Sequence, residues 1–332
     1  MYLFGQVDIM VKLIWNRSTD ITAFCDAVTL TDNMDSVTME IFCNLITAPQ
    51  DKYVTQSRPD VKVGDKLDLI GDTKTLFSGI IVEMGIAGEL TAYDYGFYLA
   101  NNDVVLQVKT DANTAITQMC SKAGIPLGTM PSMPTQINKI YADESCADIL
   151  NDILEQVTAE QGRNFYWRVK DGKLNIYEYP NTITYALHTF ETGNRLDITY
   201  ALGSVAGSDS IKDMRNAVQV VQEENETIKV LASAEDSASI QKFGRLTNVV
   251  KLSSEEQNPQ TLAVNTLKEN NTIKKQRSVS NLLGSEAVAC GVLLLFSSDK
   301  FGVTGVYMVK SVTHTFGTSH TMSLELLKTE AV

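Results

Sequence analysis

Hydrophobic and polar residues alternate along the first hundred positions, and this pattern predicts β-strands. Val7–Leu13 and Val37–Ile41 carry apolar side chains at every second position, so each has one face to bury. Lys66–Ile70 and Gly79–Val82 follow, separated by a Gly-Asp-Thr-Lys turn. Residues 1–108 are therefore interpreted as one antiparallel β domain.

The middle of the chain changes to a helical period. Apolar side chains recur at i, i+3, i+4 and i+7 before Gly124, and again within residues 145–162. A hairpin with an Asp-Gly turn is predicted at 165–176. The Gly- and Ser-rich run at 203–208 is typical of a flexible connector. Residues 109–206 are therefore interpreted as a small α+β module with its connector.

Strand-like alternation returns in the last third of the chain. It is clear at 217–221 and 322–326, while Asn258-Pro259 begins a helix with a side-chain cap and an early proline. Residues 207–332 are therefore interpreted as a second β domain with an inserted helix at about 259–271.

The two predicted β domains share an internal repeat. A shift of 226 residues places Leu67–Ile70 on Leu293–Phe296 and Gly79–Val82 on Gly305–Met308, with a polar turn between the strands in both copies. Any two β-hairpins can be matched in this way, so a true repeat and a chance likeness are both open from this alignment alone. The predicted fold class is α+β and β-rich, with two related antiparallel β domains and a small α+β module.

Composition and charge disfavour several classes of function. The 332 residues have a net charge of −12, which disfavours general binding to phosphate backbones or anionic lipid. The acidic excess is concentrated in residues 1–108, which hold 15 of the 40 acidic and 7 of the 28 basic residues. The longest apolar run, Gly291–Phe296, is far shorter than the roughly 20 residues that cross a bilayer, and the N-terminus lacks the basic region of a signal peptide. We expect a soluble protein made in a cytoplasm.

The sequence contains no recognisable catalytic or metal-binding motif. It has no nucleophile elbow, phosphate-binding loop or C-x-x-C pair, and its five cysteines are an odd number, which favours reduced, buried thiols. His314 and His320 flank a turn, but no acidic residue or cysteine beside them completes a ligand set, so a structural pair is favoured over a metal pair. We therefore expect no catalytic, cofactor-binding or metal-binding residue.

Three features each leave two interpretations open. Adjacent acids at 143–144, 223–224 and 255–256 indicate solvated charge more than a glycosidase. The basic cluster Lys274–Arg277 is either the solvated exit of a helix or a contact with an acidic partner. The aromatic segment Leu90–Leu99 is either a corner of the core or a patch buried between subunits.

Four short segments follow one another in order along the chain: Leu76–Ile80, Thr91–Tyr95, Cys120–Ile125 and Gly305–Phe316. In order and spacing, over about residues 60–326, they resemble the baseplate hub family of contractile phage tails and phage-tail-like bacteriocins. On this resemblance the candidate interface or structural residues are Gly79, Tyr93, Asp94, Tyr95, Gly305, His314 and His320.

The resemblance implies a structural protein and not an enzyme. It implies a homotrimer in which each chain supplies two tube-type β-barrel domains, so that three chains present six units between a six-fold tail tube and a three-fold spike. Implied partners are the tube protein, the spike protein and other baseplate proteins. The resemblance implies no cofactor, no membrane and no specific nucleic-acid binding, although DNA can pass through the lumen.

The implied location is the baseplate of a phage tail or tail-like particle, assembled in the bacterial cytoplasm. In such a particle, two explanations of the acidic excess in residues 1–108 are open. Acidic side chains that line the bore would repel a passing phosphate backbone, or acidic side chains on the outer surface would keep the protein soluble. The alternative functions are a cell-wall-degrading enzyme and a carbohydrate-binding tail component.

Overall fold

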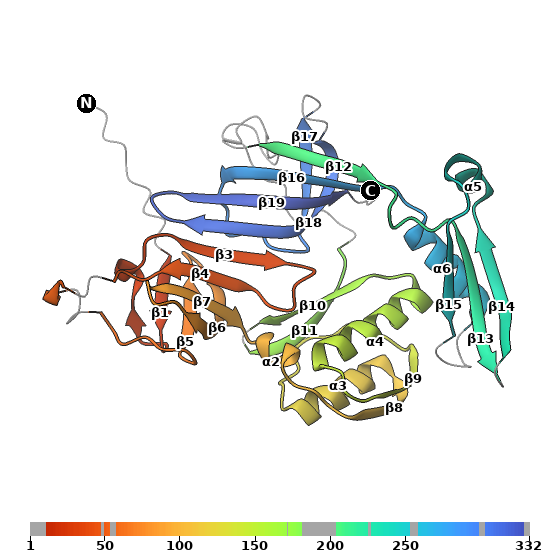
Figure 1. Cartoon of the computed structure of the whole chain (residues 1–332), viewed down its shortest axis with the longest axis horizontal. Coiled ribbons are helices and arrows are strands. Elements are labelled where there is room, and N and C mark those ends of the chain that lie inside the picture. The colour runs from red at the N-terminus through yellow and green to blue at the C-terminus, as the bar shows by residue number, and fades with distance from the viewer. Residues whose placement is uncertain are drawn as a thin grey trace.

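The computed structural model describes residues 11–47, 50–53, 58–170, 172–180, 204–224, 227–252, 258–298 and 303–328. Strands dominate and helices are few, which confirms the predicted β-rich α+β class. The described residues form four units, each with its own apolar core (Figure 1). We call them the first sheet unit (11–94), the middle unit (97–178), the second sheet unit (205–210 and 274–328) and the insert unit (217–270).

The first sheet unit is an antiparallel sheet whose inward positions are apolar. Its strands are β1 (Lys12–Trp15), β2 (Thr19–Asp20), β3 (Val28–Asn33), β4 (Glu40–Asn44), β5 (Lys66–Ile70), β6 (Thr75–Met84) and β7 (Glu89–Asp94), with a short 3-10 helix, η1 (Thr22–Phe24). The predicted strand at Val7–Leu13 lies partly outside the described residues, and β1 begins at Lys12. The strand predicted at Val37–Ile41 begins only at Glu40, because the chain turns after Asn33.

The middle unit packs two helices against two hairpin-like ladders. Its elements are α2 (Phe97–Ala100), β8 (Leu106–Asp111), α3 (Ala112–Ala123), β9 (Gln136–Tyr141), α4 (Cys146–Gln161), β10 (Phe165–Lys170) and β11 (Lys173–Glu178). Both predicted helices and the predicted hairpin are confirmed. The Ser145 side chain caps α4, and Gly124 and Gly162 end the two helices in the left-handed conformation, as helix C-termini favour.

The second sheet unit contains β12 (Val205–Ser210), β16 (Lys274–Leu283), β17 (Leu293–Ser298), β18 (Val303–Phe316) and β19 (His320–Lys328). The connector interpretation of residues 203–208 is wrong from Val205 on, because these residues form the edge strand β12. An edge strand needs a neighbour on one side only, so small polar residues are tolerated there. The basic cluster lies in β16 and not at a helix exit, and Arg277 pairs with Asp209 of β12 at 2.8 Å.

The insert unit lies in the chain between β12 and β16. It comprises β13 (Ala217–Glu224), β14 (Thr227–Glu235), α5 (Ser237–Phe243), β15 (Thr247–Lys251) and α6 (Pro259–Asn270). The predicted helix at about 259–271 is α6, capped by Asn258. The strand at 217–221, which the sequence assigned to the second β domain, instead joins a separate three-stranded sheet, because Val218 and Val220 pack against α6.

Helix α6 also ties the insert unit to the middle unit. The amide of Asn265 donates to the carbonyls of Ala159 (3.2 Å) and Glu160 (2.8 Å) at the end of α4. These carbonyls are among those that a helix C-terminus leaves without intrahelical partners. No helix within the described ranges is long and apolar enough to cross a membrane.

The two sheet units join edge to edge. Ser311–Phe316 of β18 pairs antiparallel with Val28–Asn33 of β3, so one twelve-stranded sheet runs through both units (Figure 1). The side chain of Phe316, at the end of β18, is 5% exposed and packs into the core of the first sheet unit. The second unit therefore completes the core of the first.

The sheet units also repeat one topology. Hydrogen-bonded neighbours run β3-β4-β7-β6-β5 in the first unit and β12-β16-β19-β18-β17 in the second, antiparallel throughout. An irregularity interrupts β6 between Ile81 and Glu83, and β18 between Val309 and Ser311. The predicted internal repeat is confirmed in its strand order.

The residue shift proposed for the repeat is wrong by one at β5 and β17 and by two at β6 and β18. Gly64 and Gly291, both at positive φ (90° and 81°), donate to Ile81 and Val309 respectively, at 2.8 and 2.9 Å. Ile81 and Val309 are therefore equivalent and lie 228 residues apart, and not 226. A slip of two keeps the side chains of β18 on their predicted face, so alternation could not detect it. The slip of one at β17 changes the face, but that strand is apolar at four successive positions, so alternation could not detect this slip either.

We expect Phe316→Ala to lower the free energy of unfolding by about 3–5 kcal/mol, because it empties a filled position in the first unit's core. Phe42→Ala is the matched control: Phe42 is 38% exposed on the outer side of β4 and should cost less than about 1 kcal/mol. Urea unfolding followed by tryptophan fluorescence measures both. Equal losses would contradict the shared core.

Candidate functional site at the junction of the units

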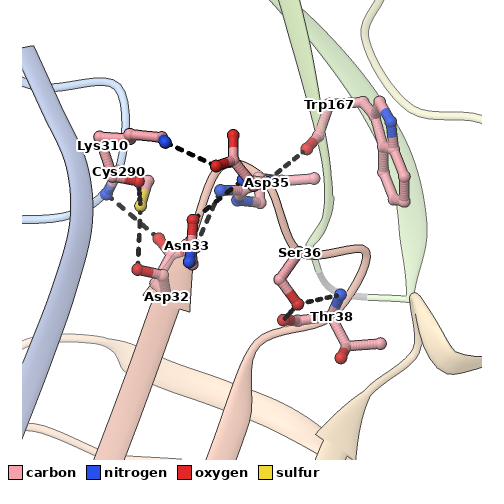
Figure 2. Close-up of polar contacts among 9 residues, drawn as sticks. Asp32, Asn33, Asp35, Ser36, Thr38, Trp167, Cys290 and Lys310 are labelled. Carbon is pink, nitrogen blue, oxygen red and sulfur yellow. Dashed lines mark hydrogen bonds and ion pairs between the residues drawn. The ribbon is translucent and has the colours of Figure 1, made fainter. Parts of the chain in front are cut away.

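Three units meet at the loop that joins β3 to β4 (Figure 2). Asp32 lies on β3 two positions after the inward-facing Leu30, and like it is buried. Its carboxylate therefore occupies a position where the alternating pattern expects an apolar side chain. A charge buried in this way needs partners.

Arg168, on β10 of the middle unit, supplies the opposite charge. Its Nη2 lies 3.0 Å from Asp32 Oδ1, and the side chains are 16% and 9% exposed. The pair lacks the alignment of a hydrogen bond, so charge and not directional bonding holds these atoms together. Burial, the largest single influence, would lower the pKa of Arg168, but the Asp32 charge together with Cys290 and Asp94 outweighs it, so the pKa is raised. Nη1 donates to the Trp167 carbonyl at 2.9 Å.

Cys290, in the second sheet unit, holds the same carboxylate from the other side. Its backbone N–H donates to Asp32 Oδ2 at 3.1 Å. Its thiol donates to the backbone carbonyls of Asp32 and Lys310, each at 3.1 Å (Figure 2). Burial raises the pKa of Cys290, so the thiol stays protonated and acts as a hydrogen-bond donor, not as a nucleophile.

The loop after β3 is held in shape by its own polar groups and by β18. Asn33 Oδ1 accepts from the Asp35 N–H at 3.0 Å, and Met34 N–H donates to the Lys310 carbonyl at 2.9 Å. The Asp35 carboxylate pairs with the Lys310 ammonium at 2.6 Å, and Ser36 bonds the backbone at Thr38 (Figure 2). The loop therefore continues the β3–β18 connection beyond the strands.

Asp94, at the end of β7, is a second buried carboxylate near Arg168. It is 3% exposed, and its Oδ1 accepts the Gly96 N–H at 2.9 Å. Burial raises the pKa of Asp94 to about 7, although two backbone N–H groups and the Arg168 charge act in the opposite direction. Asp32, Asp94 and Arg168 line one cavity of about 250 Å³ that all three units border.

Of the residues chosen from the sequence, Asp94 and His314 line this cavity. His314 Nδ1 lies 3.0 Å from His320 Nε2, and His314 Nε2 lies 2.9 Å from the Val288 carbonyl. A carbonyl only accepts, so His314 carries its proton on Nε2 and accepts from His320 on Nδ1. Burial lowers the pKa of His314, and lowers that of His320 to about 4. Within the fold, each of the two histidines therefore has a hydrogen-bond partner.

The other chosen residues lie in separate parts of the fold. Gly79 lies opposite Asp94 on β6, where a Cβ would collide with the Tyr93 carbonyl. Tyr95 is partly buried against the core of the middle unit. Gly305 lies on the far half of β18, paired with β17 and away from the junction. Across the part of the chain that the structure describes, no cluster of three His, Cys, Asp or Glu side chains could hold a metal ion.

Sequence reasoning missed Asp32 and Arg168. The signal for Asp32 was present, because it follows Val28 and Leu30 at the inward positions of one strand. Arg168 gave no such signal, since it lies on the polar side of β10 in the local pattern. Only the packing of the middle unit against the sheet shows that this side is covered.

Comparison with known proteins places the chain among tail proteins by fold. The YQBQ-like family model matches residues 28–327. No curated protein sequence matches the chain. Solved structures with the same fold include the 43 kDa tail protein of prophage MuSo2 from Shewanella oneidensis, at 9% identity over 96% of this chain and 98% of that chain, with a TM-score of 0.67.

Two further structures agree. A tail protein from Neisseria meningitidis MC58 is 11% identical over 97% of each chain, with a TM-score of 0.66. Prophage tail protein gp18 from Listeria monocytogenes EGD-e is 8% identical over 97% of this chain and 95% of that chain, with a TM-score of 0.61. At these identities the likeness establishes the fold alone, and at that level it confirms the resemblance to phage tail proteins.

We expect Asp32→Asn to lower the free energy of unfolding by about 3–5 kcal/mol, because it leaves the Arg168 charge buried without its partner. Asp35→Asn, in the same loop, removes a carboxylate that is 67% exposed and should cost at most about 1 kcal/mol. Urea unfolding of both variants measures the difference. Similar losses would show that the Asp32–Arg168 pair does not hold the units together.

The raised pKa of Asp94 predicts a pH dependence of stability. Between its ordinary value of 3.8 and about 7, the folded protein keeps a proton that the unfolded chain has released. The free energy of unfolding therefore falls as pH rises through this window, by on the order of 4 kcal/mol. In Asp94→Asn this contribution is absent, so the variant should gain stability relative to wild type as pH rises. Urea unfolding at a series of pH values measures this, and an equal change of the free energy of unfolding with pH in both proteins would contradict the account.

Proposed function

Because the chain belongs to the YQBQ-like family, we propose that it is a structural component of a phage-type tail, the trimeric hub that joins a six-fold tail tube to a three-fold spike. The fold it shares with prophage tail proteins supports a place in such a particle. The observation that carries the proposal is the repeat of one sheet topology within a single chain.

The repeat matters because of symmetry. A six-fold ring cannot meet a three-fold object through equivalent contacts unless one side duplicates its docking surface. A chain with two sheet units of the same strand order provides that duplication, and a trimer of such chains presents six units. We propose that the first and the second sheet unit act as the two tube domains, with the middle unit and the insert unit outside the ring.

The junction supplies the rigidity that a hub requires. Thrust along the tube acts on both sheet units, and any slip between them would break the continuity of the ring. The β3–β18 pairing and the Asp32 contacts to Arg168 and Cys290 resist that slip. Separating the units would leave the Asp32 or the Arg168 charge without its partner. In this function the buried ionisable groups serve mechanical coupling.

In the assembled particle, the hub has neighbours on every side. The hub contacts the tube protein on one side, the spike protein on the other, and further baseplate proteins around it. It is assembled in the bacterial cytoplasm and stays in the finished particle, whether phage or bacteriocin. Where DNA passes, acidic side chains of residues 1–108 that face the bore would repel the phosphate backbone.

Mass measurement of the purified full-length protein by light scattering tests the proposal. A trimer has three times the 36.5 kDa of one chain, and we expect that species to dominate and to persist on dilution, as extensive subunit interfaces require. A folded monomer at the highest concentration reached would contradict the trimeric hub.

A further inference from the structure

The two sheet units contact each other through strands that are not equivalent in the repeat. The second unit contributes the end of β18, and the first contributes β3. Because both units have the same strand order, each unit also contains the strand that is equivalent to the one its neighbour uses in this contact. The end of β6 in the first unit corresponds to the end of β18, and β12 in the second unit corresponds to β3.

Strand registers fix this correspondence residue by residue. In the first unit one row of hydrogen-bonded neighbours runs Thr29, Phe42, Thr91, Glu83. In the second unit the matching row runs Ala206, Ser278, Glu325, Ser311. The six residues of β3 therefore match the six residues of β12, Val205–Ser210, and Glu83 matches Ser311.

No described strand covers either of the matching surfaces within a single chain. β12 is the end strand of the large sheet, with only β16 beside it among the described strands, and most of its residues are exposed. Pairing of β6 with β5 ends at Ile80, and Glu83 is exposed beyond it. Ile86, at the turn after β6, is fully exposed. Figure 1 shows β12 and β6 in different sheet units, with the β3–β18 contact between them.

An open edge strand invites pairing with another chain unless something covers it. A contact between two different surfaces repeats head to tail, and it closes into a ring when its rotation allows. The β3–β18 pairing is such a contact already present within the chain, so it gives the geometry of the contact that the two open edges would make.

We propose that the end of β6 in one chain, Val82–Met84, pairs antiparallel with β12 of a second copy, with Glu83 opposite Ser210. This register repeats that of Ser311 opposite Asn33. By the same equivalence, the Ile211 N–H donates to the Val82 carbonyl, as Met34 N–H donates to the Lys310 carbonyl. The inference rests on the proposed function for the number of chains in the ring.

The two kinds of contact differ in length. β18 runs on to Phe316 before its turn, whereas β6 ends at Met84 and the chain turns by Gly88. The contact within a chain therefore spans six paired residues, and the contact between chains spans about half as many. The pairing between chains is accordingly the weaker of the two, and oligomers should separate there before the sheet units do.

A disulfide cross-link tests the register in the full-length protein. Glu83→Cys and Ser210→Cys are combined in a Cys25→Ser background, since Cys25 is the partly exposed native thiol and the other four are buried. Directly paired residues have Cα atoms about 4.5–5.5 Å apart, within the range that a disulfide bridges. On oxidation with diamide, we expect denaturing gels without reductant to show covalent dimers and trimers, and nothing larger.

The matched control moves one cysteine along β12. Glu83→Cys with Ala206→Cys places the second thiol about 13 Å away along the strand, on the same face, and should give no covalent oligomer. Equal cross-linking of both pairs would overturn the proposed register. Trimeric protein by mass that forms no link through Glu83→Cys and Ser210→Cys would overturn this contact and leave the hub proposal standing. A parent protein that is monomeric would overturn both.

Discussion

The whole arrangement depends on a single strand, β3, which belongs to three contacts at once. It pairs with β4 inside its own unit and with β18 of the second sheet unit, and it carries Asp32 to Arg168 of the middle unit. The decisive constraint is electrostatic, because a carboxylate buried at this depth is tolerated only with an opposite charge and hydrogen-bond donors around it. Arg168 and Cys290 supply these from two other units, so the Asp32 charge is satisfied only when all three have assembled.

The sheet units show how one fold can be repeated without identical sequence. Their strand order, registers and β6/β18 irregularity agree, and the turn glycines Gly64 and Gly291 share the same unusual backbone conformation. Side chains at equivalent positions differ freely as long as alternate faces stay apolar. The first unit also has β1 and β2 beside β5, and the second has the insert unit between β12 and β16. The units differ as well in the reach of one hairpin, and that difference lets the second unit extend β18 over the first.

Local patterns predicted the elements well, and long-range contacts explain what they missed. Helices α3 and α4 followed from their apolar spacing and their terminal glycines, which are local signals. The strand β12 was missed because an edge strand of small polar residues has the same composition as a connector. The insert unit was missed because its strands look like any others, and only packing against α6 separates them from the large sheet.

The candidate site was predicted in part for the same reason. Asp94 and His314 were chosen and both line the junction cavity, whereas Gly305 lies elsewhere on β18. Arg168 could not be chosen from its strand, because the side of β10 that it occupies is covered only in the assembled fold. A buried acid at an inward strand position, such as Asp32, is the local signal worth following in similar sequences.

Hydrogen exchange followed by mass spectrometry tests the central claim most directly, that the two sheet units are one continuous sheet held at β3. We expect backbone amides of Val28–Asn33 and Ser311–Phe316 to exchange as slowly as those of β4 and β7 inside the first unit. Fast exchange of Ser311–Phe316, with both cores still protected, would show that the units open independently and would contradict the account.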